Sequence, residues 1–301
     1  MVLVVLTAAA LAVGAALWAI LIERNLFVLR RATLRLLPPG SPPVRVLHIS
    51  DVHMAPWQRR KAAWIAGLAR SRPDVVVSTG DLLGHRDGLT GITRALEPFR
   101  GIPGAFVHGS NDYYGPVLKN PLRYLGGPSR EPDEAERLDT EALTAWLRDL
   151  GWQDLTNRRA DGGVGDISIA WTGVDDPHLG RDQVSPQSET DASWLSSTIR
   201  IGVSHAPYLR VLDALTSSGA ELIFAGHTHG GQVRLPDRFG GALVTNCDLP
   251  RAYARGVHTW RSGDASSTLS ISAGLGTSIT APIRFFCRPE ATLLTLVAVD
   301  A

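Results

Sequence analysis

Short apolar runs, each ending in a turn, constrain the fold of this chain more than any other feature. Three such runs in the first half are typical of buried strands, and five more follow in the second half: Val44–Ser50, Val75–Gly80, Gly104–Gly109, Ile167–Gly173, Ile199–His205, Leu222–His227, Ser267–Gly276 and Thr292–Val299. Trp57–Arg70 and Glu134–Leu150 have helical spacing between them. Strands that alternate with helices predict an α/β domain with helices packed outside the sheets.

Polar residues follow several of these runs at the point where each strand would end. Asp51 and His53 follow the first run, Asp81 follows the second, and the other three end later runs: His205, His227 and His229. Residues just past the carboxyl ends of strands converge on one rim of an α/β sheet, where ligands bind. Carboxylate and imidazole are ligands of Mn, Fe and Zn. The pattern predicts a metal site at that rim.

The first 22 residues differ in kind from the rest. Val2–Ile22 contains no charged residue, and at about 1.5 Å per residue it matches a hydrocarbon core of roughly 30 Å. A cleaved signal peptide is the alternative, but no Lys or Arg precedes the run and it is longer than a usual signal core. We therefore predict a retained, single-pass membrane helix. The basic residues after it place the main domain in the cytoplasm by the positive-inside rule: Arg24, Arg30, Arg31 and Arg35.

The segment after this helix alternates apolar residues with Arg. Leu26–Leu37 is compatible with a helix lying along the membrane surface or with a short solvated helix. Leu37–Pro43 is rich in proline and predicts a linker. The predicted organisation is a transmembrane helix at 1–23, an amphipathic segment and linker at 24–43, and a catalytic domain at 44–301.

Composition excludes one class of partner and leaves other questions open. The net charge of +1 gives no reason to expect nucleic acid. Cys247 and Cys287 are far apart in the chain and could be free thiols or one disulfide. Tyr114–Pro132 is rich in Pro and Gly without a clear period. A loop of this length is compatible with a lid on the substrate side, which we favour, or with an inert surface excursion. The oligomeric state cannot be inferred.

Four motifs resemble those of one known family. "SDVH", "TGD", "VSHAP" and "AGHTHGGQ", in this order and spacing, are similar to those of the calcineurin-like metallophosphoesterases, especially the bacterial membrane-associated branch with an N-terminal hydrophobic helix. The resemblance covers about Val44–Val299. It implies a four-layer sandwich of two mixed β-sheets flanked by helices. It also implies two divalent metal ions, of which one is bound by Asp51, His53 and His229, the other by His205 and His227, with Asp81 bridging both.

The chemistry implied by the resemblance is hydrolysis at phosphorus. Two cations roughly 3.5–4 Å apart bind phosphate oxygens and activate a bridging hydroxide, with Mn favoured over Fe and Zn. Neither a GxSxG nucleophile motif nor a P-loop occurs in the sequence.

The stretch "GSND" departs from the family's "GNHD" or "GNHE" element, which supplies a ligand Asn and a catalytic His. An ungapped match puts Ser110 at the ligand position. A one-residue slip makes Asn111 the ligand and leaves Asp112 where the His would stand; we favour the slip because an amide oxygen is a better neutral ligand than a hydroxyl. The catalytic candidates are therefore Asp112, Asn111 and His108. His85 is also nearby, and structural roles are favoured for both histidines.

These inferences predict a metal-dependent phosphodiesterase or pyrophosphatase. A missing acid matters least for a good leaving group, so the predicted substrate is a phosphorylated small molecule or lipid such as a UDP-diacylglucosamine-like molecule, the last by resemblance only. The alternative is a membrane-anchored metal-binding or lipid-binding protein without turnover.

Overall fold

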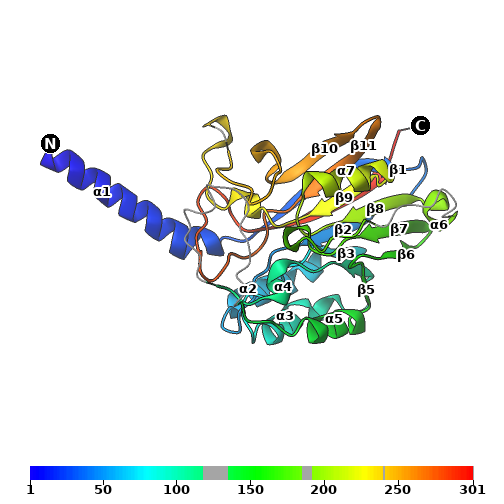
Figure 1. Cartoon of the computed structure of the whole chain (residues 1–301), viewed down its shortest axis with the longest axis horizontal. Helices are drawn as coiled ribbons and strands as arrows, with labels where there is room; N and C mark the ends of the chain where they lie inside the picture. The colour runs from blue at the N-terminus through cyan, green and yellow to red at the C-terminus, as the bar shows by residue number, and fades with distance from the viewer. Residues whose placement is uncertain (118–134, 185–191, 240, 301) are drawn as a thin grey trace.

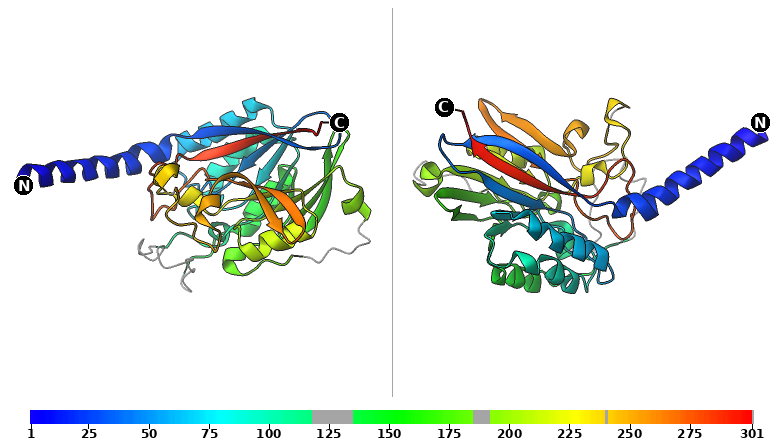
Figure 2. Two further views of the ribbon diagram at one scale, coloured as in Figure 1. Left: turned by 90° about the horizontal axis from the view of Figure 1, so that it is seen from above. Right: turned by 180° about the vertical axis from the view of Figure 1, so that it is seen from behind.

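The computed structural model describes residues 1–117, 135–184, 192–239 and 241–300. They form two six-stranded sheets that face each other, with helices on both outer faces (Figures 1 and 2). The strand orders are β1-β12-β2-β3-β4-β5 and β10-β11-β9-β8-β7-β6. Both sheets mix parallel and antiparallel pairs; β12 is antiparallel to β2, for example, whereas β2 and β3 are parallel. The predicted four-layer α/β sandwich is confirmed.

The first sheet contains β1 (Val28–Leu37), β2 (Val44–Ile49), β3 (Val75–Ser78), β4 (Gly104–Phe106), β5 (Trp152–Asp154) and β12 (Glu290–Ala298). The second contains β6 (Arg159–Val164), β7 (Ile167–Gly173), β8 (Ile199–Val203), β9 (Leu222–Ala225), β10 (Gly256–Ser262) and β11 (Ala265–Ile271). The helices are α1 (Val2–Leu17), α2 (Arg59–Gly67), α3 (Leu89–Leu96), α4 (Ser110–Tyr113), α5 (Thr140–Asp149), α6 (Ala192–Ser196) and α7 (Leu209–Ser217).

Alternation along the strands divides the core into layers. On β2, Val46 belongs to the core between the sheets, whereas Leu47 packs on the helix side with Ile65 of α2. The inter-sheet core is completed from the second sheet by residues such as Ile201 and Phe224. Because successive side chains of a strand point to opposite faces, a continuous apolar run buries both of its faces. This is why the inner strands lack a polar stripe.

The expectation of a helix at Leu26–Leu37 was wrong. Residues 28–37 form β1, an edge strand that pairs in parallel with β12. Its side chains alternate with a period of two: Ala32 and Leu34 pack against the inter-sheet core, whereas Arg31 and Arg35 are exposed. Alternation of this kind fits a strand with one buried face and does not give a helix a continuous apolar stripe.

The other strands and helices predicted from the sequence lie close to the observed ones. Each of the eight predicted strands coincides with a strand in the same place, although most end a few residues earlier than predicted. The helix predicted at Glu134–Leu150 begins only at Thr140, where the Asp139 carboxylate accepts a hydrogen bond from the Ala142 N–H as an N-cap. The predicted lid lies largely outside the described residues.

The N-terminal helix projects from the domain (Figure 1). The helical stretch Val2–Asn25 is long and apolar enough to cross a membrane, with a mean hydropathy of 2.4, and no residue of α1 is buried. Its last turns contact the domain: the Arg284 N–H donates to Ala19 O over 3.1 Å, and the Cys287 N–H donates to Glu23 Oε1 over 2.6 Å. The helix is therefore attached to the loop that precedes β12.

Both cysteines are free thiols.

Candidate metal centre

Most of the predicted metal ligands adopt an unusual backbone conformation. Ten non-glycine residues in the described part of the chain have positive φ, and five of them are predicted ligands: Asp51, His53, Asp81, His227 and His229, at φ of 43–66°. A left-handed conformation costs a non-glycine residue about 1 kcal/mol or more and typically persists at functional sites. Each of the five lies two to four residues beyond the end of β2, β3 or β9, so the sharp change of direction occurs in the loops at the sheet rim.

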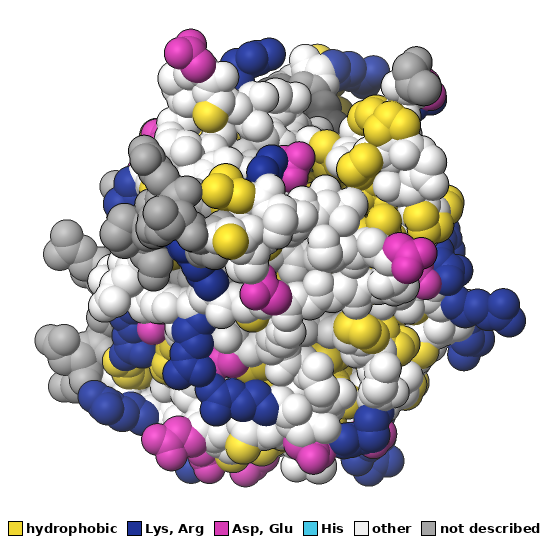
Figure 3. Space-filling model, turned by 90° about the vertical axis from the view of Figure 1, so that its right-hand side faces the viewer, with side chains coloured by type: hydrophobic (Ala, Val, Ile, Leu, Met, Phe, Trp, Pro, Cys, Tyr) yellow, Lys and Arg dark blue, Asp and Glu magenta, His cyan; other side chains and the backbone are white. Residues whose placement is uncertain are grey.

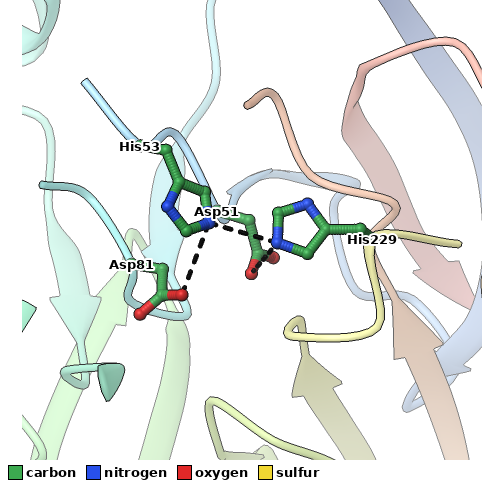
Figure 4. A group of neighbouring side chains, drawn as sticks. All are labelled: Asp51, His53, Asp81 and His229. Carbon is green, nitrogen blue, oxygen red and sulfur yellow. Dashed lines mark hydrogen bonds and ion pairs between the residues drawn. The ribbon is translucent and has the colours of Figure 1, made fainter. Parts of the chain in front are cut away.

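Four of these residues form one cluster (Figure 4). One potential ligand atom from each of Asp51, His53, Asp81 and His229 lies within 4.8 Å of the others. His53 Nε2 is 3.1 Å from His229 Nε2 and 3.4 Å from Asp81 Oδ2, and His229 Nε2 is 3.6 Å from Asp51 Oδ1. Two imidazole nitrogens and two carboxylate oxygens thus face the same small volume.

Asp81 also faces a second group of predicted ligands. Its Oδ2 lies 3.6 Å from His205 Nε2 and accepts a hydrogen bond from Asn111 Nδ2 over 2.8 Å. His227 Nδ1 is 3.3 Å from the same His205 Nε2. Asp81 is therefore the residue shared by both groups, as expected of a bridging ligand.

The short helix α4 distinguishes the three candidates in "GSND". The side chain of Asn111 donates a hydrogen bond to Asp81, whereas Ser110 is buried beside it and its hydroxyl does not contact Asp81. The Asp112 carboxylate accepts hydrogen bonds from the backbone N–H groups of Leu82, Leu83 and Gly109 over 2.8–3.0 Å. Asp112 is fully buried and holds the loop that carries Asp81 in place. This geometry favours the slipped alignment.

The predicted acids His108 and Asp112 do not face the metal cluster. His108 Nε2 lies 2.8 Å from Thr144 Oγ1 on α5, and its ring packs on Phe106 and Tyr113. His85 Nδ1 accepts a hydrogen bond from Asp87 N, and the His85 ring packs edge-on against Trp57. The positions of these side chains do not support an acid role for them.

Another histidine, which the sequence analysis did not identify, lies closer to the metal cluster. His178 lines the cavity over the cluster; its ring centroid is 4.5 Å from that of His227, and its Nδ1 is 3.1 Å from Tyr208 Oη. It follows β7 in "DDPH", and this position after a strand is the signal that could have identified it. Figure 3 shows the opposite end of the domain, where no histidine is visible among the charged and hydrophobic side chains.

Burial sets the electrostatics of the cluster. Desolvation raises the pKa of Asp81 to about 8 and also raises that of Asp51, although His205 opposes both shifts. Desolvation lowers the pKa of His53 to about 3, with Lys61 and His205 adding to the effect. His205 differs: desolvation lowers its pKa, but Asp81, Asp176 and Asp51 outweigh this and raise it to about 9.

These residues fit a bound divalent cation. Asp51 and Asp81 are at most 2% exposed, and buried carboxylates need a cation or several hydrogen bonds to stay ionised. His53 Nε2 and His229 Nε2 point at each other beside them, an arrangement suited to two neutral imidazoles with a cation as the shared partner. The His227 N–H donates to Asp51, and His205 Nδ1 is 2.7 Å from Thr79 O, which orients the two ligands.

Glycines let backbone approach the cluster. A Cβ on Gly109 would collide with the Asp81 carboxylate and lie 2.6 Å from the His205 ring. A Cβ on Gly226 would collide with Ser50 Oγ and lie 2.6 Å from Asp51 Oδ2. Only glycine fits at these two positions unless a ligand moves.

Arg284 supports the cluster from the N-terminal helix side. This fully buried residue donates from its guanidinium to Gly276 O over 2.6 Å, to Ala273 O over 2.7 Å and to His229 O over 3.2 Å. Since its backbone N–H binds Ala19 O, one residue joins the end of the N-terminal helix to the backbone of a predicted ligand.

A cavity of about 340 Å³ opens over the cluster. His53, Asp81, Asn111, His227 and His229 lie among the residues of its polar end. The rest of its wall is largely apolar and includes Pro116, Val117, Val233, Leu243, Val244, Ala281 and Ile283. The cavity therefore places a polar site against a surface suited to an apolar group.

Comparison with known proteins agrees with this architecture. Residues 44–231 match the calcineurin-like phosphoesterase family, and the chain belongs to this family. It is 27% identical over 270 residues to the uncharacterized metallophosphoesterase YkuE of Bacillus subtilis, a match covering 87% of this chain and 82% of YkuE. It is 24% identical over 285 residues to the phosphodiesterase YaeI of Escherichia coli, covering 91% of this chain and 90% of YaeI.

Similarity to solved structures is more distant. A dimetal phosphatase from Danio rerio aligns with a TM-score of 0.42 and 12% identity, over 78% of this chain and 88% of the phosphatase.

Proposed function

We propose that this chain is a membrane-anchored, metal-dependent phosphodiesterase or pyrophosphatase. The observation that supports the proposal is the arrangement of the other six predicted ligands around Asp81, which directly neighbours His53, His205 and Asn111. These side chains would hold divalent cations, with Mn favoured, and the chemistry such cations would supply is charge neutralisation of phosphate oxygens and a lower pKa of water.

The residues of this chain have distinct roles in that reaction. The carboxylates of Asp51 and Asp81 and the imidazoles would hold the cations. Gly109 lets the backbone approach Asp81 and His205 closely. His178 lines the same cavity and can donate a hydrogen bond to the leaving-group oxygen.

The proposed substrate is a phosphodiester or pyrophosphate that carries an apolar group, including lipid-linked and nucleotide-linked molecules. The largely apolar wall of the cavity supports this, with Val233, Val244 and Ile283 within reach of a molecule bound at the cluster. The candidate span Val2–Asn25 supports a location in the cell membrane, and the arginines after it favour the cytoplasmic side for the domain.

A binding protein without turnover is the second candidate function. The observation that favours it is the absence of His from "GSND", because neither Asp112 nor His108 lines the cavity over the cluster. Activity measurements separate the two candidates.

The test measures hydrolysis of bis-(p-nitrophenyl) phosphate by the full chain in detergent with Mn²⁺. We expect Asp81→Asn and His229→Ala to lose activity by more than about 100-fold. Asp161→Asn and His258→Ala, which change the same residue types away from the cluster, should keep it. Metal content is measured in parallel. Bound metal without hydrolysis would overturn the catalytic proposal in favour of the binding protein.

A further inference from the structure

Four exposed hydrophobic side chains lie on two loops beside the metal-site cavity: Leu235, Phe239, Leu243 and Phe286, which are 45%, 62%, 38% and 54% exposed. We call these four residues the apolar rim. Leu243 also lines the cavity. The apolar rim therefore borders the mouth of the cavity that holds the metal cluster.

The two loops of the apolar rim are joined by backbone hydrogen bonds. Val233 and Phe285 form an isolated parallel bridge, in which the Arg234 N–H donates to Phe285 O over 2.9 Å and the Phe285 N–H donates to Gln232 O over 3.0 Å. The two loops that carry the apolar rim are therefore joined to each other next to the cavity.

The same backbone is attached to the N-terminal helix. Arg284, next to Phe285, donates its N–H to Ala19 O, and the Glu23 carboxylate accepts from the Cys287 N–H and from Trp18 Nε1. Both views in Figure 2 place the segments 235–239 and 241–243 at the end of the domain from which α1 projects. Phe286 of the apolar rim thus lies within the segment that is attached to the base of the helix.

The attachment point fixes the depth of the rim relative to a bilayer. Ala19 lies roughly 26 Å along the helix from Val2 at about 1.5 Å per residue, which is close to the hydrocarbon thickness of about 30 Å. A spanning helix would therefore hold Ala19, and with it Arg284–Phe286, near the boundary between acyl chains and headgroups. Trp18, 45% exposed, suits the same boundary.

Basic side chains accompany the apolar rim. The Arg238 guanidinium lies 4.8 Å from the ring centroid of Phe239, and both residues are exposed. Arg251 donates to Leu243 O and Arg288 to Leu26 O, and both are also exposed. A hydrophobic side chain next to a cation matches the transition from acyl chain to anionic headgroup.

We propose that the apolar rim inserts into the bilayer surface and sets the mouth of the metal-site cavity against the lipid headgroups. This surface goes beyond anchoring by the helix, because it orients the cavity as well as holding the domain nearby. It rests on the proposed membrane location of Val2–Asn25 and is independent of catalysis. A phosphoester attached to a lipid would then reach the cluster without leaving the bilayer.

The test uses the full chain in nanodiscs of phosphatidylglycerol and phosphatidylcholine with a phospholipid that carries a photoreactive diazirine near its acyl carbonyl. After irradiation, we expect labelled peptides from the N-terminal helix and from residues 235–243 and 283–288. Leu195 and Val257, 60% and 37% exposed on other parts of the domain, serve as controls and should remain unlabelled. Labelling confined to the helix would overturn the proposal, as would cross-links of the rim to a second copy of the chain. An unlabelled helix would overturn the membrane location itself.

A second measurement tests orientation. Phe239→Ser combined with Phe286→Ser should lower photolabelling of the rim about tenfold, with Leu195→Ser as the matched control. If the chain hydrolyses phosphodiesters, the double variant should lose activity on a bilayer-embedded substrate and keep it on soluble bis-(p-nitrophenyl) phosphate. Equal loss on both substrates would contradict an orienting role. If the double variant does not fold, labelling of the unmodified chain still decides the proposal.

Discussion

Two cavities lie beside α4, and they are lined by different kinds of side chain. The first, of about 340 Å³, contains the metal-ligand candidates and an apolar wall. The second, of about 590 Å³, is lined by His108 and by polar and charged residues that include Arg137, Arg148, Arg158 and Arg181. The larger cavity contains none of the predicted metal ligands. The volume of a cavity therefore does not identify the candidate active site in this fold. The metal-ligand candidates that line the cavity identify it.

Neighbouring residues of α4 divide between the two cavities. Ser110 and Asn111 line the first, Tyr113 lines the second, and Asp112 lines neither because its carboxylate is taken up by backbone N–H groups. In a single helical turn, successive side chains point in different directions. A shift of one residue in alignment therefore moves the position expected for the acid from Asn111, which lines the first cavity, to Asp112, which lines neither. The predictions below use this difference.

Among substitutions in and around α4, the largest effect is expected at Asn111. Asn111→Ala removes the amide that contacts Asp81 and should lower kcat/KM by about 100-fold. Ser110→Ala is the matched control and should change kcat/KM by less than about threefold, since the hydroxyl makes no contact with Asp81 that the structure records. The measurement is bis-(p-nitrophenyl) phosphate hydrolysis over a range of Mn²⁺ concentrations. The reverse order of effects would restore the ungapped alignment.

The candidate metal ligands were more predictable from sequence than a candidate for the catalytic acid. Asp51, His53 and Asp81 follow apolar runs closely, so a linear pattern is enough to bring them to one rim. The choice of a candidate acid depends instead on the direction in which a side chain points after a turn. His108 is only three residues from Asn111, yet it faces α5 and the second cavity, whereas the distant His178 lines the first.

The strands also differ in how well a local sequence pattern predicts them. The inner strands were predicted because both of their faces are buried. By contrast, β1 carries Arg on its exposed face and was assigned to a helix, and β5 is only three residues long, Trp152–Asp154. The edge strand β1 depends on pairing with the distant β12, and a local pattern does not contain that partner.

A smaller and more selective effect is expected at His178. If it donates to the leaving-group oxygen, His178→Gln should lower kcat about tenfold for a phosphodiester with an alkyl leaving group. Hydrolysis that releases p-nitrophenolate, a weak base, should change little. The dependence of kcat on leaving-group pKa across a substrate series is the measurement.

His108→Gln is the control for this comparison. It removes a buried contact with Thr144 and should lower the free energy of unfolding by about 1–3 kcal/mol. The dependence on leaving-group pKa should stay that of the unmodified chain. A change in that dependence for His108→Gln, but not for His178→Gln, would return the acid role to His108.

The smallest effect on catalysis is expected in the second cavity, at Asp154. Burial alone raises the pKa of this carboxyl, but hydrogen bonds from Thr156 and Arg148 outweigh it and lower the pKa below its usual value. Arg148 donates to Asp154 over 2.7 Å. A carboxyl with a depressed native pKa stabilises the fold above its unfolded pKa of about 3.9, and this contribution is lost as the pH falls through the native pKa.

Asp154→Asn should therefore lower the free energy of unfolding by about 1–2 kcal/mol at pH 7. The difference from the unmodified chain should shrink at acidic pH, and phosphodiester hydrolysis at pH 7 should be unchanged. Denaturant unfolding across pH 3–7 measures the first two, with Asp161→Asn on the exposed face of β6 as the control. If Asp154→Asn instead reduced kcat as strongly as Asn111→Ala, the two cavities would not be functionally separate, because a charge that contacts only the second would be needed for chemistry in the first.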